Sequence, residues 1–366
     1  MLCMYWTWLY KAVCVIIFVL YFSKISSQIV TGGNAQYGFI MPHHPEMKSL
    51  IKGHVKSFDL FLEFPTNGKQ EWHYRYNFPT WGVSFYTADL ANREQTGWAL
   101  GVYPYFNLPL FSGKSFRIKQ KVGWGVGYLT KYFHRQENHK NIIVGSAINA
   151  IVNLTTSAEI DISKKIKSRI AFSFIHFSNA SYAQPNLGYN LPAASLGFLY
   201  SFGNTDTPKN ADTLADFKTT FYVSSIVAGG VKEILPAGGK KYPAFVHSLD
   251  AAYRFTYKSG VALTGDLYYN TSIKERLQRD TISVTDVGIM QPGVALFYRI
   301  YFGKINMSLG MGTYIYSRLK DDGIFYHRFI TRYQLNERIF LNVVLKTHFF
   351  KADFAEFGIG YHLWKK

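Results

Sequence analysis

A histidine and a serine two residues apart are the side chains of this sequence whose types and spacing best suit covalent chemistry. His176 and Ser178 end a segment in which large apolar residues alternate with small or polar ones. On a β-strand, residues i and i+2 share one face with Cα atoms about 7 Å apart, so a serine hydroxyl can reach the imidazole. With His176 as general base and Ser178 as nucleophile, the pair would form an esterase. The alternative is that both side chains lie at a membrane interface and are solvated by lipid headgroups.

The strand that carries this pair indicates where the chemistry would occur. Its outward series is Ile170, Phe172, Phe174, His176 and Ser178, and its inward series is Arg169, Ala171, Ser173, Ile175 and Phe177. The reactive pair would therefore share the apolar, lipid-facing side. Because an imidazole is costly to place in lipid without partners, a polar pair at this position is a functional hypothesis, and its substrate would arrive laterally from the membrane.

The same two-residue alternation runs through most of the chain after residue 27. Ile305, Met307, Leu309 and Met311, for example, alternate with small or polar residues. A period of two predicts β-strands, and these segments have about ten residues where globular strands average about five or six. Aromatic residues gather near the segment ends, as interfacial girdles do. The pattern favours an all-β fold, a transmembrane antiparallel β-barrel, over a soluble β-sandwich.

We predict sixteen strands, with fourteen as the alternative because the first is weak. The predicted strands are 34–41, 55–64, 80–89, 97–107, 115–130, 142–154, 166–178, 193–203, 216–229, 244–257, 260–270, 291–302, 304–316, 325–334, 338–349 and 352–364. They are expected to close into a single outer-membrane barrel domain over residues 28–366, with the tight turns on the periplasmic side. The polar face, which includes Arg117, Lys119, Lys121 and Lys346, would line a plugged interior, with a channel as the alternative.

Composition excludes several classes of protein. The chain has 366 residues, 48% of them hydrophobic and 17% aromatic, with a formal net charge of +17. That hydrophobic content excludes a disordered chain, and beyond the N-terminus no run of about 18 apolar residues predicts a membrane helix. No nucleic-acid-binding motif is found, and a phosphate-bearing membrane surface suits the positive charge better. We expect no cofactor and no metal, because His43, His44 and the other histidines lack metal-ligand spacing.

Residues 1–27 are predicted to be a signal peptide. Lys11 precedes an apolar run from Ala12 to Phe22, and small residues precede Gln28. Both cysteines, Cys3 and Cys14, would be lost on cleavage, so the exported protein would have no disulfide. A retained N-terminal anchor helix is the alternative.

The residues around the reactive pair resemble a known family. The stretch His176-Phe177-Ser178-Asn179-Ala180, followed by Gln184-Pro185-Asn186-Leu187-Gly188-Tyr189-Asn190, closely resembles the active-site strand of the outer-membrane lipid A 3-O-deacylases. A looser similarity to acyloxyacyl-hydrolase-like barrels extends over much of the mature chain. The resemblance implies an outward-facing Ser–His pair in the outer membrane of a Gram-negative bacterium. That pair would hydrolyse the ester-linked acyl chain at the 3-position of the lipid A of lipopolysaccharide.

Two residues depart from that family's pattern. The family has a Glu at the third triad position, fourteen residues after the His, where this chain has Asn190, and commonly a Gly where it has Ser181. An Asn can orient His176 but cannot stabilise its charged form as a Glu would. Outer-membrane phospholipase A barrels, which are similar in this region, use an Asn there, so a phospholipase is the first alternative. A non-catalytic pore or structural barrel is the second.

The remaining expectations concern the oxyanion and the partners. The backbone N–H groups of Asn179 and Ala180 and the side chain of Asn186 are the candidate oxyanion donors. A role as a turn residue after Pro185 is the alternative for Asn186. The expected partners are lipopolysaccharide, through its lipid A, and other outer-membrane lipids, with a homodimer left open. Basic residues of the long loops, such as Arg276 and Arg279, are candidates for contact with lipid A phosphates.

Overall fold

The part of the chain that the structure describes is an all-β structure of sixteen antiparallel strands. The computed structural model describes residues 28–203, 214, 216–349 and 351–366, so the predicted signal peptide lies outside the described residues. The strands are β1 (Gln28–Gly38), β2 (Val55–Pro65), β3 (Thr80–Asp89), β4 (Trp98–Ser112), β5 (Phe116–Leu129), β6 (Ile148–Asp161), β7 (Ile166–Ser178), β8 (Tyr189–Gly203), β9 (Thr220–Glu233), β10 (Lys241–Arg254), β11 (Ser259–Asn270), β12 (Met290–Phe302), β13 (Ile305–Tyr314), β14 (Phe325–Gln334), β15 (Ile339–His348) and β16 (Lys351–Lys365). The predicted fold class and the higher of the two strand counts are confirmed.

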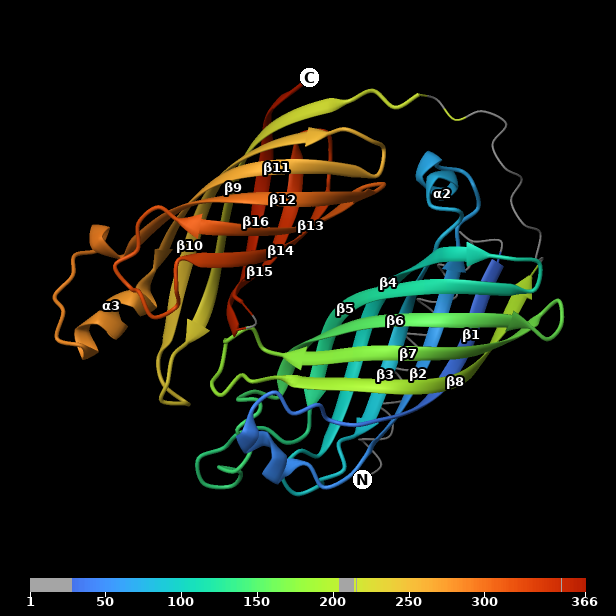
Figure 1. Cartoon of the computed structure of the whole chain (residues 1–366), viewed down its shortest axis with the longest axis horizontal. Helices are drawn as coiled ribbons and strands as arrows, with labels where there is room; N and C mark the ends of the chain where they lie inside the picture. The colour runs from blue at the N-terminus through green and yellow to red at the C-terminus, as the bar shows by residue number, and fades with distance from the viewer. Residues whose placement is uncertain (1–27, 204–213, 215, 350) are drawn as a thin grey trace, which may run out of the picture.

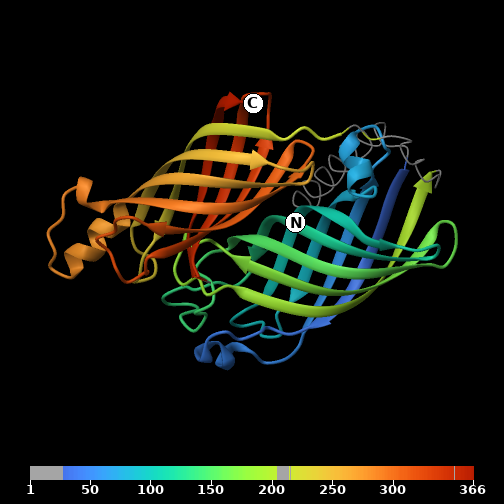
Figure 2. The same ribbon diagram turned by 45° about the horizontal axis from the view of Figure 1, so that its top comes forward.

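The strands close into two barrels of eight strands each, so the prediction of a single barrel was wrong. Strand β8 pairs with β1 from Gln28↔Gly203 to Gly38↔Ala193, which completes the first ring. Strand β9 pairs with β16 and starts the second ring. Alternation is the same in one large ring as in two small ones, because it records only which face each residue occupies. Figures 1 and 2 show the two barrels beside each other.

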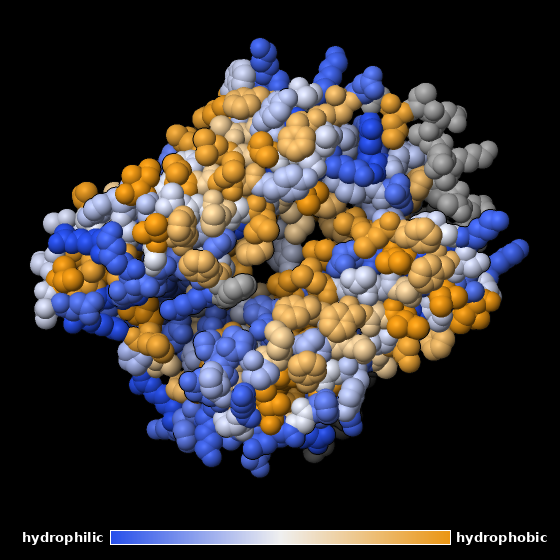
Figure 3. All heavy atoms as spheres, in the orientation of Figure 1, coloured by the Kyte–Doolittle hydropathy of each residue, from blue (hydrophilic) through white to orange (hydrophobic). Residues whose placement is uncertain are grey.

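The period-two pattern sorts side chains between the barrel wall and the barrel interior. On β8, Leu196 and Phe198 are 65% and 63% exposed, whereas Ser195 and Leu199 are buried. On the face drawn in Figure 3, hydrophobic side chains cover much of the strand walls, and hydrophilic ones gather toward the loops around α3 (Thr271–Arg279). An apolar outer wall is what a barrel surrounded by lipid requires.

Charged side chains fill both interiors as ion pairs. In the first barrel Arg169 bridges Glu63 at 2.8 Å and Glu159 at 2.6 Å. In the second barrel Lys346 pairs with Asp353 at 2.6 Å. These pairs agree with the predicted plugged interior, since an eight-stranded ring encloses just enough space for its own side chains. The small ring thus gives a physical reason against the channel alternative.

Connections of different kinds occupy the two ends of the barrels. One end carries tight turns such as 113–115, 162–165 and 303–304, together with α2 (Glu71–Arg75). The other end carries longer connections, which hold the 3-10 helices η1 (Pro45–Leu50) and η2 (Val287–Ile289) and helix α3. Within the described part of the chain, no helix is both long and apolar enough to cross a membrane.

The barrels contact each other at both ends. At the tight-turn end the Tyr76 hydroxyl, just after α2, donates to the carbonyl of Tyr301 at 2.8 Å, and the rings of Phe106 and Phe302 stack 5.8 Å apart. At the other end the 179–188 connection after β7 contacts the rim of the second barrel. The second barrel is therefore placed to influence the segment that follows Ser178.

We expect Arg169→Met to lower the free energy of unfolding by about 3–5 kcal/mol, because it leaves the buried carboxylate of Glu63 without its cation and leaves Glu159 paired with Lys119 alone. Denaturant unfolding in detergent micelles measures this. Arg93→Met is the matched control, since Arg93 is 77% exposed and lies 3.5 Å from Asp89, and it should cost less than about 1 kcal/mol. Equal losses in the two variants would contradict the role assigned to the interior network.

Candidate active site

Pairing of β7 with β8 brings together the first and third residues of the predicted triad. His176 lies directly opposite Asn190 in the ladder. Their side chains meet, with Nδ1 of His176 2.6 Å from Oδ1 of Asn190. An amide oxygen only accepts hydrogen bonds, so Nδ1 carries the proton and Nε2 keeps its lone pair. Nε2 is the atom that a general base would use.

Ser178 lies on the same strand face as His176, at the last residue of β7. Ala150 of β6 is its partner across the ladder, and Ser178 is 8% exposed. Ile170 and Phe172, earlier on this face, are 54% and 60% exposed, which agrees with the predicted outward orientation. No hydrogen bond between Ser178 and His176 occurs among the described residues. Catalytic hydrogen bonds are often long without substrate and tighten when it binds.

A second histidine, His43, contacts the site and was missed by the sequence analysis, which noted only that it lacks metal-ligand spacing. Its Nδ1 lies 3.2 Å from Nδ2 of Asn190, and its Nε2 lies 3.0 Å from the carbonyl oxygen of Leu187. His43 is far from the motif in sequence and reaches it only because β1 and β8 are neighbours in the closed barrel. The residues themselves gave no signal for this contact.

The predicted oxyanion donors differ in their availability. Oδ1 of Asn186 accepts the backbone N–H of Asn179 at 2.9 Å, so the expectation that this N–H is a free oxyanion donor was wrong. This bond gives Asn186 a loop-shaping contact, while its Nδ2 stays without a partner within the described ranges. The N–H of Ala180 also has no hydrogen-bond partner in the described part of the chain. Ala180 N–H and Asn186 Nδ2 are therefore the two donors left for a developing negative charge.

Gly188 allows the loop backbone to approach the imidazole. Its φ is +83°, and a Cβ added there would lie 2.8 Å from Cε1 of His176 and 2.9 Å from the carbonyl oxygen of Phe177. The backbone N–H groups of Leu187 and Gly188 both donate to the carbonyl of Ile143, at 2.8 and 3.1 Å. Gly188 thus lets the loop backbone pack against one side of the His176 ring, which is a role beyond the turn flexibility that glycine usually provides.

Ser181 ties the loop after Ser178 to the second barrel. Its hydroxyl donates to the carbonyl of Ala352 at 2.8 Å, and its own carbonyl accepts the N–H of Glu233 at 2.8 Å. Gln184 Nε2 donates to the carbonyl of Glu233 at 3.2 Å. Ser181 has a φ of +61°, a conformation in which glycine would be unstrained. The bonds to the second barrel offset the strain that this serine introduces.

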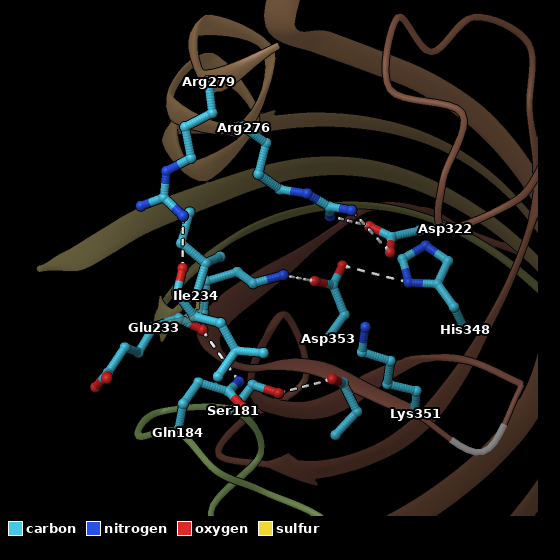
Figure 4. Close-up of a pocket in the computed structure, with 13 residues that line it drawn as sticks. Ser181, Gln184, Glu233, Ile234, Arg276, Arg279, Asp322, His348, Lys351 and Asp353 are labelled. Carbon is cyan, nitrogen blue, oxygen red and sulfur yellow. Dashed lines mark hydrogen bonds and ion pairs between the residues drawn. The ribbon is translucent and has the colours of Figure 1, made fainter. Parts of the chain in front are cut away.

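A cavity of about 240 Å³ lies where this loop meets the second barrel. Ser181 and Gln184 line it from the first barrel, and charged side chains including Arg276, Asp322 and Asp353 line it from the second (Figure 4). Burial would raise the pKa of Asp322, but its hydrogen bond to the Arg276 guanidinium and the positive charge there hold the pKa below its ordinary value. The acids of this wall are thus bound to their own cations.

Two family descriptions match the chain, one for each barrel. Residues 56–199 match the family described as Lipid A 3-O-deacylase (PagL). The first barrel belongs to the lipid A 3-O-deacylase family. Residues 221–366 match the family described as Acyloxyacyl hydrolase, C-terminal domain. The deacylase family is one of ester hydrolases, so the expectations of an enzyme family and of an outer-membrane β-barrel are confirmed.

Two solved structures are similar to the chain. The crystal structure of the outer membrane enzyme PagL is 18% identical and covers 46% of this chain and 98% of its own, with a TM-score of 0.30. A triple mutant of the Rhodopseudomonas blastica porin is 10% identical and covers 92% of this chain and 99% of its own, with a TM-score of 0.19. None of the curated proteins matches the chain.

In this deacylase-family barrel we expect Gly188→Ala to lower ester hydrolysis about 100-fold or more, because the new methyl group displaces His176 and a 1 Å misplacement costs about that factor. Turnover of a chromogenic acyl ester by detergent-folded protein measures the loss. Gly265→Ala is the matched control, since a Cβ there meets nothing within 4 Å. If Gly188→Ala retained full activity, the packing role of Gly188 would be refuted.

We expect the double variant Ser181→Ala with Gln184→Leu to lower turnover about three- to tenfold, because each lost hydrogen bond loosens the loop that carries Ala180 and Asn186. Thermal unfolding should change little, since the strand ladders of both barrels are untouched. Tyr182→Phe is the comparison, because it keeps the ring that lies 4.6 Å from Nζ of Lys241 in the second barrel and removes only the hydroxyl of a side chain that is 53% exposed. An unchanged turnover in the double variant would show that the second barrel does not hold the loop.

Proposed function

We propose that the first barrel is a serine esterase of the outer membrane that removes an ester-linked acyl chain from lipid A. Ser178 is the nucleophile, His176 the general base and Asn190 the residue that orients the base. The observation that carries this proposal is the 2.6 Å contact between His176 and Asn190 on the face that also carries Ser178. The family of the first barrel supports the 3-position of lipid A as the site of cleavage.

In the first half of the reaction, Oγ of Ser178 attacks the acyl carbonyl carbon and its proton passes to Nε2 of His176. The negative charge on the carbonyl oxygen would be stabilised by Ala180 N–H and Asn186 Nδ2. When the intermediate collapses, the ester C–O bond breaks and the leaving hydroxyl takes the proton from His176. The acyl group stays on Ser178.

In the second half, a water molecule attacks the acyl carbonyl carbon and gives its proton to His176. The bond to Ser178 then breaks, the serine recovers its proton and a free fatty acid is released. Asn190 is neutral, so it holds the ring of His176 through both halves without adding a negative charge beside the imidazolium. We expect turnover to be slower than a glutamate at this position would give.

A phospholipase is the second candidate function, and Asn190 is the observation that favours it. The outer-membrane phospholipase A barrels that this region resembles have an asparagine as third member. Both substrates present an acyl ester, so the products of hydrolysis distinguish the two functions.

Mass spectrometry of lipid A and phospholipids after incubation with detergent-folded protein tests the proposal. We expect wild-type protein to remove one hydroxyacyl group from lipid A. Ser178→Ala and His176→Ala should lower the rate about 10³-fold or more, and Asn190→Ala about 10- to 100-fold.

The products decide between the candidates. Lysophospholipid instead of deacylated lipid A would assign the barrel to the phospholipases. If folded wild-type protein, checked by its circular dichroism spectrum, changed neither lipid, the esterase proposal would be rejected. Activity that survived Ser178→Ala would reject the nucleophile.

A further inference from the structure

An asparagine in the third position of a triad faces a problem that a glutamate does not. Both oxygens of a carboxylate accept hydrogen bonds, so either can hold the Nδ1–H of the base. An amide has one oxygen and one NH₂ group of nearly the same shape. If the amide of Asn190 rotated by half a turn, its NH₂ group would face His176 and favour the tautomer with the proton on Nε2. That tautomer cannot accept the proton of Ser178.

The contacts of His43 hold the amide in the productive orientation. Nε2 of His43 lies 3.0 Å from the carbonyl oxygen of Leu187, which only accepts, so Nε2 carries the proton. Nδ1 of the neutral ring is then an acceptor, and it lies 3.2 Å from Nδ2 of Asn190. The amide oxygen is thereby left for Nδ1–H of His176 at 2.6 Å. In this series of hydrogen bonds from Leu187 to His176, each donor faces one acceptor.

We propose that His43 is a positioning residue, which sets the orientation of the Asn190 amide and through it the reactive tautomer of His176. This inference rests on the proposed function. It also gives a reason why a neutral asparagine can serve where the family has a glutamate. His43 fixes the orientation of the Asn190 amide, whereas a carboxylate has two equivalent oxygens and needs no such contact.

The segment that carries His43 is anchored beside the site by backbone bonds. The N–H of Phe39 donates to the carbonyl of Pro192 at 3.2 Å, and the N–H of Met41 donates to the carbonyl of Asn190 at 2.8 Å. These bonds continue the β1–β8 ladder past the end of β1. The carbonyl of Leu187 is held in turn, because the N–H groups of Leu187 and Gly188 bond to Ile143. His43 therefore sits between two fixed backbone segments.

A double-mutant cycle with Asn190→Glu separates orientation from a general structural role. His43→Phe keeps a ring but removes the acceptor. In the Asn190 background we expect kcat to fall about tenfold with KM unchanged, the factor that one net hydrogen bond gives. In the Asn190→Glu background the same change should alter kcat less than about twofold, because a carboxylate needs no orientation. His44→Phe is the control, since the ring of His44 packs edge-on against His43 and its side chain makes no hydrogen bond in the described part of the chain.

Equal losses in the two backgrounds, or no loss in either, would overturn the proposal. The ¹⁵N chemical shifts of His176 at alkaline pH provide a readout that does not require activity. We expect the Nδ1–H tautomer in wild type and a mixture of tautomers in His43→Phe. An unchanged tautomer in His43→Phe would also overturn the proposal.

Failure of the proposed function looks different. If no Ser178-dependent hydrolysis is found, the esterase fails, while the tautomer measurement still decides the role of His43. If hydrolysis depends on Ser178 but His43→Phe is fully active, the function stands and this inference fails.

Discussion

Closure of each sheet is the constraint on which the rest of this structure depends. A bilayer offers no hydrogen-bond partners, so a strand edge left open in it would carry unsatisfied N–H and C=O groups along its length. The first sheet removes its edges by pairing β1 with β8, and the second by pairing β9 with β16. Rings of eight strands enclose narrow interiors, which explains why charged residues such as Arg169 form ion pairs there.

The same closure assembles the candidate site. The β7–β8 register places His176 opposite Asn190, and the β1–β8 pairing carries His43 to the other side of that amide. The site thus stands on three strand segments that the barrel holds in fixed register. Because His176 and Ser178 share the outward face of β7, the proposed reaction would let an acyl chain reach them without leaving the bilayer.

The second barrel changes the surroundings of the site. At its rim, the carbonyl of Ala352 accepts a hydrogen bond from the Ser181 hydroxyl. The backbone N–H of Glu233 donates to the Ser181 carbonyl. Ser181 stands where the deacylases commonly have glycine, in a left-handed conformation that a serine adopts at a cost. The second barrel therefore gives a physical explanation for this departure from the family pattern, since its rim stabilises the conformation that glycine would adopt freely.

The resemblance to the lipid A 3-O-deacylases added Asn190 to the candidate site. Local periodicity and spacing in the sequence determined the strands, the outward face of β7 and the shared face of His176 and Ser178. Those features depend on which face of a strand each residue occupies, and a period of two in the sequence indicates that face directly. Only the tertiary structure decided that sixteen strands form two rings, that the N–H of Asn179 is already bound to Asn186, and that His43 contacts Asn190. Strand pairing and side-chain contacts join residues that are distant in the chain, and alternation contains no information about which edges meet.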